Sequence, residues 1–123
     1  MKRILLVDDN DLVRRSLARV LSSTGVEVDT ADDLTKAVLL MCVAADLSPY
    51  DAVISDMDLG NGHDAGGLAV LEVARRILPG ARRVLVSGST FEEGPVREAI
   101  DTGACDRFLP KPCRADDLLK ALL

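Results

Sequence analysis

Short apolar runs alternate with longer amphipathic stretches five times along this chain of 123 residues. The runs have the length and composition of strands, and the stretches repeat their apolar residues at the spacing of a helix. This strict alternation predicts an α/β domain in which a parallel sheet carries helices on both faces. The strands are expected at residues 3–7, 26–30, 51–55, 82–87 and 105–110, and the helices near 11–23, 33–46, 66–78, 95–102 and 115–122.

The polarity of the strands predicts their order in the sheet. Strands 3–7, 51–55 and 82–87 are almost wholly apolar, which is typical of central parallel strands. Strand 26–30 alternates apolar with acidic residues, and strand 105–110 ends on a proline, which cannot donate a ladder hydrogen bond. Both features suit an edge. The sequence therefore predicts the order 2-1-3-4-5 of a flavodoxin-like, doubly wound (βα)5 sandwich.

Length, apolar content and charge narrow the class of protein. Residues 1–123 are expected to form one domain, with no output module visible. The longest apolar run, residues 37–45, is too short to cross a bilayer, and no secretion signal precedes the first strand, so no membrane contact is expected. A net charge of −5 argues against direct nucleic-acid binding. Three widely spaced cysteines argue against a disulfide framework or zinc site and favour the cytoplasm.

Acidic side chains follow two neighbouring strands. Asp8 and Asp9 come directly after strand 3–7, and Asp56 comes directly after strand 51–55. Ligands of doubly wound sheets bind outside the carboxyl ends of the strands where the winding direction reverses, here between these two strands. Carboxylates about 4 Å apart repel by roughly 4 kcal/mol at an effective dielectric constant near 20. Either some of these carboxyls are protonated or a cation lies among them, and hard oxygen ligands suit Mg²⁺ or Mn²⁺.

Two further strand ends carry polar groups toward the same edge. Ser87 closes strand 82–87, and Lys111 follows strand 105–110. A lysine adds a permanent positive charge, and a hydroxyl adds a donor and an acceptor beside it. An acidic cluster, a hydroxyl and a lysine at four strand ends are typical of a site that handles phosphate.

Four motifs, "LLVDDN", "DAVISDMDL", "VLVSGS" and "GACDRFLPKP", occur in this order along essentially the whole chain. Together they resemble the receiver domain of two-component response regulators. The resemblance implies that Asp56 accepts a phosphoryl group from a sensor histidine kinase, a histidine phosphotransfer protein or a small phosphodonor. It also implies that Asp9, Asp56 and the backbone carbonyl of Asp58 bind Mg²⁺, with Asp8 acting through water. Such a protein is not an enzyme beyond self-catalysed phosphoryl transfer and slow autodephosphorylation.

The resemblance further implies a conformational switch. Lys111, aimed by a cis peptide bond to Pro112, would pair with the phosphoryl group. Ser87 would hydrogen-bond to it, and Phe108 would turn inward behind Ser87. Residues 88–94 are expected to form a loop that reorders on phosphorylation, because the Gly-Pro pair at its end delays the next helix.

The family's usual surfaces suggest where partners bind. The face made by residues 95–102, 105–110 and 115–122 would signal to an unknown downstream effector or output domain, or form a homodimer. Leu12, Arg15 and Arg19 are the expected kinase contacts, and Val13, Leu17 and Val20 are expected to face the core. The apolar run at residues 39–43 is consistent either with core packing or with a hidden interface.

The segment 57–67, "MDLGNGHDAGG", departs from the family pattern, since it is longer than usual and lacks the customary proline. We expect a surface loop in which His63 is exposed to solvent rather than a ligand. Asp58 is expected to alter the lifetime of the acyl phosphate.

Two alternatives stay open at this point. The "DMD" at residues 56–58 is similar to the nucleophile motif of haloacid-dehalogenase-type Mg²⁺-dependent phosphatases, in which Asp56 would be the nucleophile. The second alternative is a degenerate receiver that acts only as a binding module.

Overall fold

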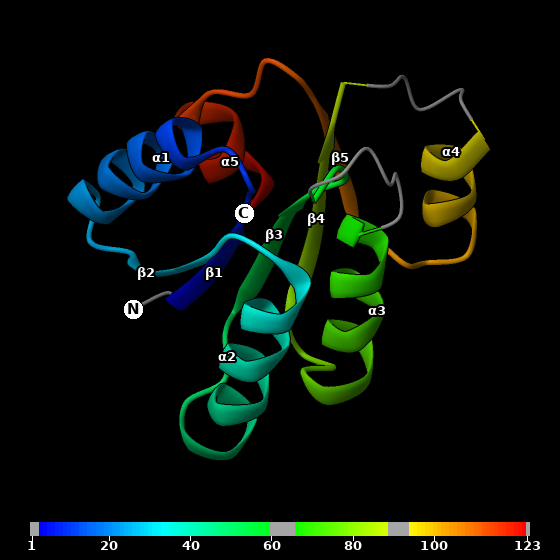
Figure 1. The fold of residues 1–123 in the computed structure, drawn as a ribbon, viewed down its shortest axis with the longest axis horizontal. Coiled ribbons are helices and arrows are strands. Elements are labelled where there is room, and N and C mark those ends of the chain that lie inside the picture. The colour runs from blue at the N-terminus through cyan, green and yellow to red at the C-terminus, as the bar shows by residue number, and fades with distance from the viewer. Residues whose placement is uncertain (1–2, 60–65, 89–93, 123) are drawn as a thin grey trace.

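The computed structural model describes residues 3–59, 66–88 and 94–122, which form five strands and five helices in strict alternation (Figure 1). The strands are β1 (Arg3–Val7), β2 (Glu27–Ala31), β3 (Ala52–Asp56), β4 (Arg82–Ser87) and β5 (Arg107–Pro110). The helices are α1 (Asp11–Ser23), α2 (Leu34–Leu47), α3 (Gly66–Ile77), α4 (Gly94–Asp101) and α5 (Ala115–Ala121). Within these described residues, no helix combines the length and the apolar character that crossing a membrane requires.

All four strand pairings are parallel, and the strands lie in the order β2-β1-β3-β4-β5. The predicted fold and strand order are therefore confirmed. The last strand begins two residues later than expected, at Arg107. The amide of Cys105, in the connection between α4 and β5, donates to the carbonyl oxygen of Ala99 in α4 at 3.3 Å and so takes no part in the β4–β5 ladder.

The sheet separates two apolar cores, because successive side chains of a strand point to opposite faces. On β1, Leu5 and Val7 pack with buried residues of α2, α3 and α4, whereas Ile4 and Leu6 pack with buried residues of α1 and α5. Figure 1 shows α1 and α5 together on one side of the sheet and α2 and α3 on the other. The carboxyl ends of the central strands thus lie between two helical layers.

The prediction that Val13 and Val20 face the core is wrong, because both are exposed, at 42% and 48%. The inward stripe of α1 instead passes through Leu17 and Leu21. Arg14 occupies the first position of that stripe, at the i, i+3, i+7 spacing of one helix face, and this turns the two valines to its flank. The expected kinase contacts Leu12, Arg15 and Arg19 are all exposed.

Candidate functional site

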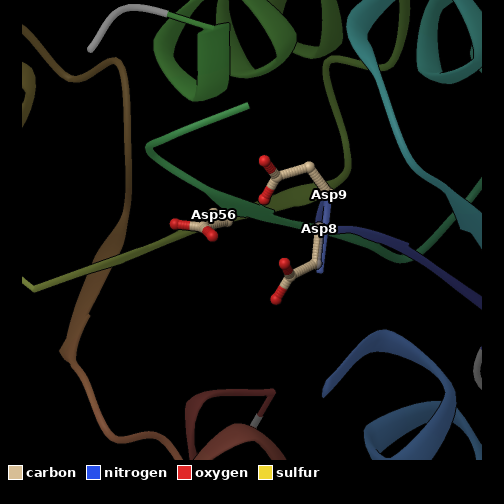
Figure 2. Close-up of side chains that lie close together, drawn as sticks. All are labelled: Asp8, Asp9 and Asp56. Atoms are coloured by element: carbon tan, nitrogen blue, oxygen red, sulfur yellow. The ribbon is translucent and has the colours of Figure 1, made fainter. Parts of the chain in front are cut away.

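Three carboxylates meet at the carboxyl ends of β1 and β3, the two adjacent central strands (Figure 2). One oxygen each from Asp8, Asp9 and Asp56 lies within 4.8 Å of the others. Asp8 and Asp56 are 6% and 4% exposed, while Asp9 is open to solvent. Asp56 lies at this edge because it is the last residue of β3. Asp8 is held here because its amide donates to the carbonyl oxygen of Ala31 at 3.1 Å and so extends the β1–β2 pairing.

The crowding of these carboxylates changes the pKa of Asp8. Burial raises its pKa above the ordinary value, and the nearby charges of Asp56 and Asp9 raise it further. The amide of Asn10 donates to Asp8 Oδ1 at 2.9 Å and, like the charge of Lys111, opposes that rise without cancelling it. Two of the three carboxylates are buried and one is exposed, and such a group fits a hard divalent cation. The carboxylate oxygens would bind the cation on its protein side, and its solvent side would stay open to water or phosphate.

Lys111 compensates part of the negative charge. Its ammonium Nζ donates to Asp56 Oδ2 at 2.7 Å. Burial alone would lower the pKa of Lys111, but its hydrogen bond to Asp56 and the charges of Asp56, Asp8 and Asp58 outweigh burial and raise it. The Lys111–Pro112 peptide bond is cis, as predicted, and the Lys111 amide donates to the carbonyl oxygen of Ser87 at 2.9 Å. The lysine is thereby fixed to the end of β4.

The other residues singled out from the sequence lie on the same strands or close to them. Ser87 is buried at the end of β4, opposite Pro110 of β5. Phe108 is half-buried on β5 and packs against the core on the α2 and α3 side. Asp58 is exposed, and its amide donates to Asp56 Oδ1 at 3.3 Å. The two oxygens of Asp56 therefore have different partners.

Sequence reasoning missed two residues that support the site. The guanidinium of Arg14 donates to the backbone carbonyl of Asp8 at 3.0 Å and pairs with Asp11, and its side chain is only 13% exposed. Gly67, at the start of α3, lies so close to β3 that a Cβ atom there would be 2.1 Å from the carbonyl oxygen of Asp56. No motif marks either residue; only a Gly-Gly pair at residues 66–67 hints at the second.

A mainly apolar cavity of ≈ 500 Å³ adjoins the acidic cluster between α1 and the segment that follows β5. Its polar end is formed by Asp8, Asp56 and Lys111, and its apolar part includes Leu17 and Cys113. A larger hollow of ≈ 650 Å³ lies among Asp51, Arg82, Arg107 and their neighbours, and contains none of the site residues. We assign the site to the smaller cavity, because chemically reactive groups converge only there among the described hollows.

Several predictions lie outside the described residues. They are the exposure of His63, most of the segment 57–67, and the reordering of residues 88–94, of which 60–65 and 89–93 are not described. These stay predictions.

Comparison with known proteins gives a consistent result. Residues 4–123 match the family described as response regulator receiver domain. The acid tolerance regulatory protein ActR of Sinorhizobium medicae (strain WSM419) is 34% identical over 122 residues, 99% of this chain and 58% of that protein. The chain thus spans little more than half of the length of this curated relative.

Solved structures show the same similarity. A receiver domain protein from Clostridium thermocellum superimposes with a TM-score of 0.81 at 25% identity, over 99% of this chain and 91% of that chain. A response regulator from Burkholderia pseudomallei, crystallised with a phosphorylated aspartic acid, a calcium ion and citrate, gives a TM-score of 0.83 at 26% identity, over 100% of this chain and 67% of that chain.

Proposed function

This chain belongs to the receiver domains of two-component response regulators, and from that premise we propose that Asp56 is the residue that accepts the phosphoryl group. The observation that carries the proposal is the surroundings of Asp56: a buried carboxylate with two further carboxylates within 4.8 Å and an ammonium at 2.7 Å. Phosphoryl transfer is catalysed mainly by positioning and by charge neutralisation, and these are the groups that supply both.

The transfer itself is a displacement at phosphorus. An oxygen of Asp56 attacks the phosphorus atom, an O–P bond forms, and the bond from phosphorus to the donor's imidazole nitrogen breaks. A carboxylate is a weak nucleophile, so in-line positioning and nearby positive charge carry the catalysis. Lys111 moves its hydrogen bond from the carboxylate to a phosphoryl oxygen as the acyl phosphate forms. Asp9, Asp56 and the backbone carbonyl of Asp58 would hold Mg²⁺, or Mn²⁺ in its place, with Asp8 acting through water. The bound ion would neutralise charge on the phosphoryl oxygens.

The response of the fold to phosphorylation follows from the same groups. Ser87, buried at the end of β4, turns its hydroxyl toward the phosphoryl group, and Phe108 on the neighbouring β5 turns inward. Residues 88–94, the last of which begins α4, and the face made by α4, β5 and α5 then signal to an effector. The phosphorylated aspartic acid and the calcium ion of the Burkholderia pseudomallei relative support the phosphoacceptor and metal-binding parts of the proposal.

Partners and location are also part of the proposal. The phosphodonor is a sensor histidine kinase or a histidine phosphotransfer protein, and the effector is a separate partner or an output domain, with residues 1–123 acting as one receiver domain. A homodimer through α4, β5 and α5 stays a prediction. The three free cysteines, Cys42, Cys105 and Cys113, support a cytoplasmic location.

Incubation of the chain with acetyl phosphate and Mg²⁺, followed by intact mass spectrometry, tests the proposal. The wild-type chain is expected to gain one phosphoryl group, and Asp56→Asn or metal-free wild type to gain none. The family match does not favour the phosphatase alternative. A separate turnover assay distinguishes the two functions, because a phosphatase would release many equivalents of phosphate from a phosphomonoester, whereas a receiver would stop near one label per chain. A wild-type chain that stays unlabelled and releases no phosphate from a phosphomonoester would favour the binding-module alternative and would refute the proposal.

A further inference from the structure

The cavity of ≈ 500 Å³ beside the acidic cluster extends beyond the groups that handle phosphate. Its polar end contains Asp8, Asn10, Asp56 and Lys111, and the rest of its wall is apolar and comes from the sheet, α1, α5 and the segment after β5. This volume lies within the range of about 300–1,000 Å³ that is usual for small-molecule sites. A hydrated metal ion uses the polar end alone, because ordered water needs polar partners that the apolar wall does not supply.

Solvent reaches part of the apolar wall. Val13 on α1 is 42% exposed and Cys113 is half-buried, and both line the cavity. Burial, and then the charge of Asp117, raises the pKa of the Cys113 thiol to about 11, so this side chain is neutral at pH 7. A ligand that enters beside Val13 therefore meets an uncharged wall.

The polar end has more negative than positive charge. The charged groups that interact there are four carboxylates and one ammonium, those of Asp8, Asp9, Asp56, Asp58 and Lys111. In the adjoining first turn of α1, Arg14 and Arg15 both pair with Asp11. With these three included, five carboxylates stand against three bases. The polar end therefore attracts a cation and repels an anion.

Asp8 is the carboxylate that faces the apolar part of the cavity. It is 6% exposed and lines the cavity, and Figure 2 shows its side chain pointing toward the side of the sheet that α1 and α5 cover. Its Oδ1 accepts from the Asn10 amide at 2.9 Å, and within the described part of the chain no hydrogen bond is made to its Oδ2. Because a carboxylate has about four acceptor positions, Asp8 can bind a further donor in the cavity.

We propose that this cavity binds a small organic cation, a protonated amine joined to an alkyl or aromatic body. The ammonium donates to Asp8, and the body fills the apolar part of the cavity beside Val13 and Cys113, where it leaves water. A neutral ligand would fill the same space without its charge being attracted by the carboxylates. The amine and Mg²⁺ compete for the same negative charge, so the amine opposes phosphorylation of Asp56; this consequence rests on the proposed function.

Calorimetric titration of the metal-free chain with 4-phenylbutylamine tests the binding. The matched probes are 4-phenylbutanol, which lacks the charge, and butylamine, which lacks the aromatic body. Both are expected to bind about tenfold or more weakly than 4-phenylbutylamine, because each uses one part of the site. An amine that does not bind, or that binds no more tightly than the alcohol, overturns the proposal.

Two variants locate the ligand. Cys113→Phe places a ring in the cavity and is expected to weaken binding of 4-phenylbutylamine about tenfold, while Cys42→Phe, at an exposed cysteine of α2, is the matched control. Asp8→Asn removes the proposed acceptor and is expected to weaken binding to a similar extent, with Asp116→Asn as its control. Circular dichroism shows whether each variant folds. A folded Cys113→Phe or Asp8→Asn chain that binds the amine like wild type would place the ligand elsewhere.

Labelling with acetyl phosphate at limiting Mg²⁺ separates this inference from the proposed function. The wild-type chain is expected to be labelled more slowly in the presence of 4-phenylbutylamine, and excess Mg²⁺ is expected to restore the rate. An unchanged rate at a saturating amine concentration contradicts the competition with Mg²⁺. A chain that is not labelled even without the amine contradicts the proposed function instead, and the calorimetric result still decides whether the cavity binds the amine.

Discussion

Asp8 and Asp56 are buried, although an ionised carboxylate in an apolar environment is costly unless it is paired. The structure supplies one full counter-charge, Lys111 at 2.7 Å from Asp56, and weaker compensation from the backbone amides of Asn10 and Asp58. The pKa of Asp8 stays raised in spite of them. At the residue scale, the site therefore has more negative charge than its own groups neutralise, which is the physical reason to expect a cation there.

Tyr50 is buried at the other end of the sheet's core, and its hydroxyl donates a hydrogen bond to Asp29 Oδ2 at 2.7 Å. Burial, and then the hydrogen bond and charge of Asp29, raise the pKa of Tyr50 far above its ordinary value. Because the folded-state pKa exceeds the unfolded value of about 10, this contribution to stability is complete below about pH 10 and is lost as the pH rises beyond it. We expect Tyr50→Phe to lower the free energy of unfolding by about 1 kcal/mol at pH 7.

Above pH 10 the difference in stability between wild type and Tyr50→Phe should shrink, because only the wild type loses the contribution of the neutral hydroxyl. Urea denaturation of both proteins between pH 7 and about pH 11 measures it. A difference in the free energy of unfolding that stays constant over this range would show that the pKa of Tyr50 is the same in the folded and unfolded states.

Among the elements, α3 approaches the end of β3 closely at Gly67. A Cβ on Gly67 would lie 2.1 Å from the carbonyl oxygen of Asp56 and 2.6 Å from Cα of Met57, and backbone atoms cannot yield as a flexible side chain can. The Gly67 amide also donates to the carbonyl oxygen of Met57 at 3.0 Å. The start of α3 and the phosphoacceptor strand therefore hold each other in place.

We expect Gly67→Ala to lower the free energy of unfolding by about 1–3 kcal/mol and to slow phosphorylation by acetyl phosphate, because the added methyl group displaces Asp56. Gly80→Ala is the control, since nothing lies within 4 Å of the position of its Cβ. Urea denaturation and intact mass spectrometry give the two readouts. Equal behaviour of the two variants would show that the contact does not constrain Asp56.

The elements themselves were largely predictable, since β1, α1 and β4 have the expected bounds. The carboxylates and Lys111 were expected to meet because parallel strands end at a common edge. Arg14 and Gly67 were not found in advance, because their roles depend on how closely a helix approaches the end of the strand that precedes it. The prediction of which face of α1 is buried was wrong for the same reason. A half-buried arginine, Arg14, bonded to the Asp8 carbonyl, takes the place on the inward face that the apolar pattern assigned to valine.

For the whole molecule, the excess negative charge predicts that Mg²⁺ stabilises the fold. A ligand that binds only the native state adds about 2.7 kcal/mol to the free energy of unfolding at a concentration of 100 times its Kd. We expect Mg²⁺ to raise the thermal unfolding midpoint of the wild type, and Asp9→Asn to lose most of that increase. Asp116→Asn, an exposed acid on α5, is the control and should respond like wild type. A full response to Mg²⁺ in Asp9→Asn would place the ion elsewhere.

If this chain is phosphorylated as proposed, phosphorus becomes attached to one carboxylate at the edge of the sheet, and that residue can be identified chemically. The chain is treated with acetyl phosphate and Mg²⁺, the acyl phosphate is reduced with borohydride, and peptide mass spectrometry locates the resulting homoserine. We expect homoserine at position 56 alone, because Asp56 is the proposed phosphoacceptor. Homoserine at position 8, 9 or 58, or none in a protein whose mass had shown one phosphoryl group, would contradict it.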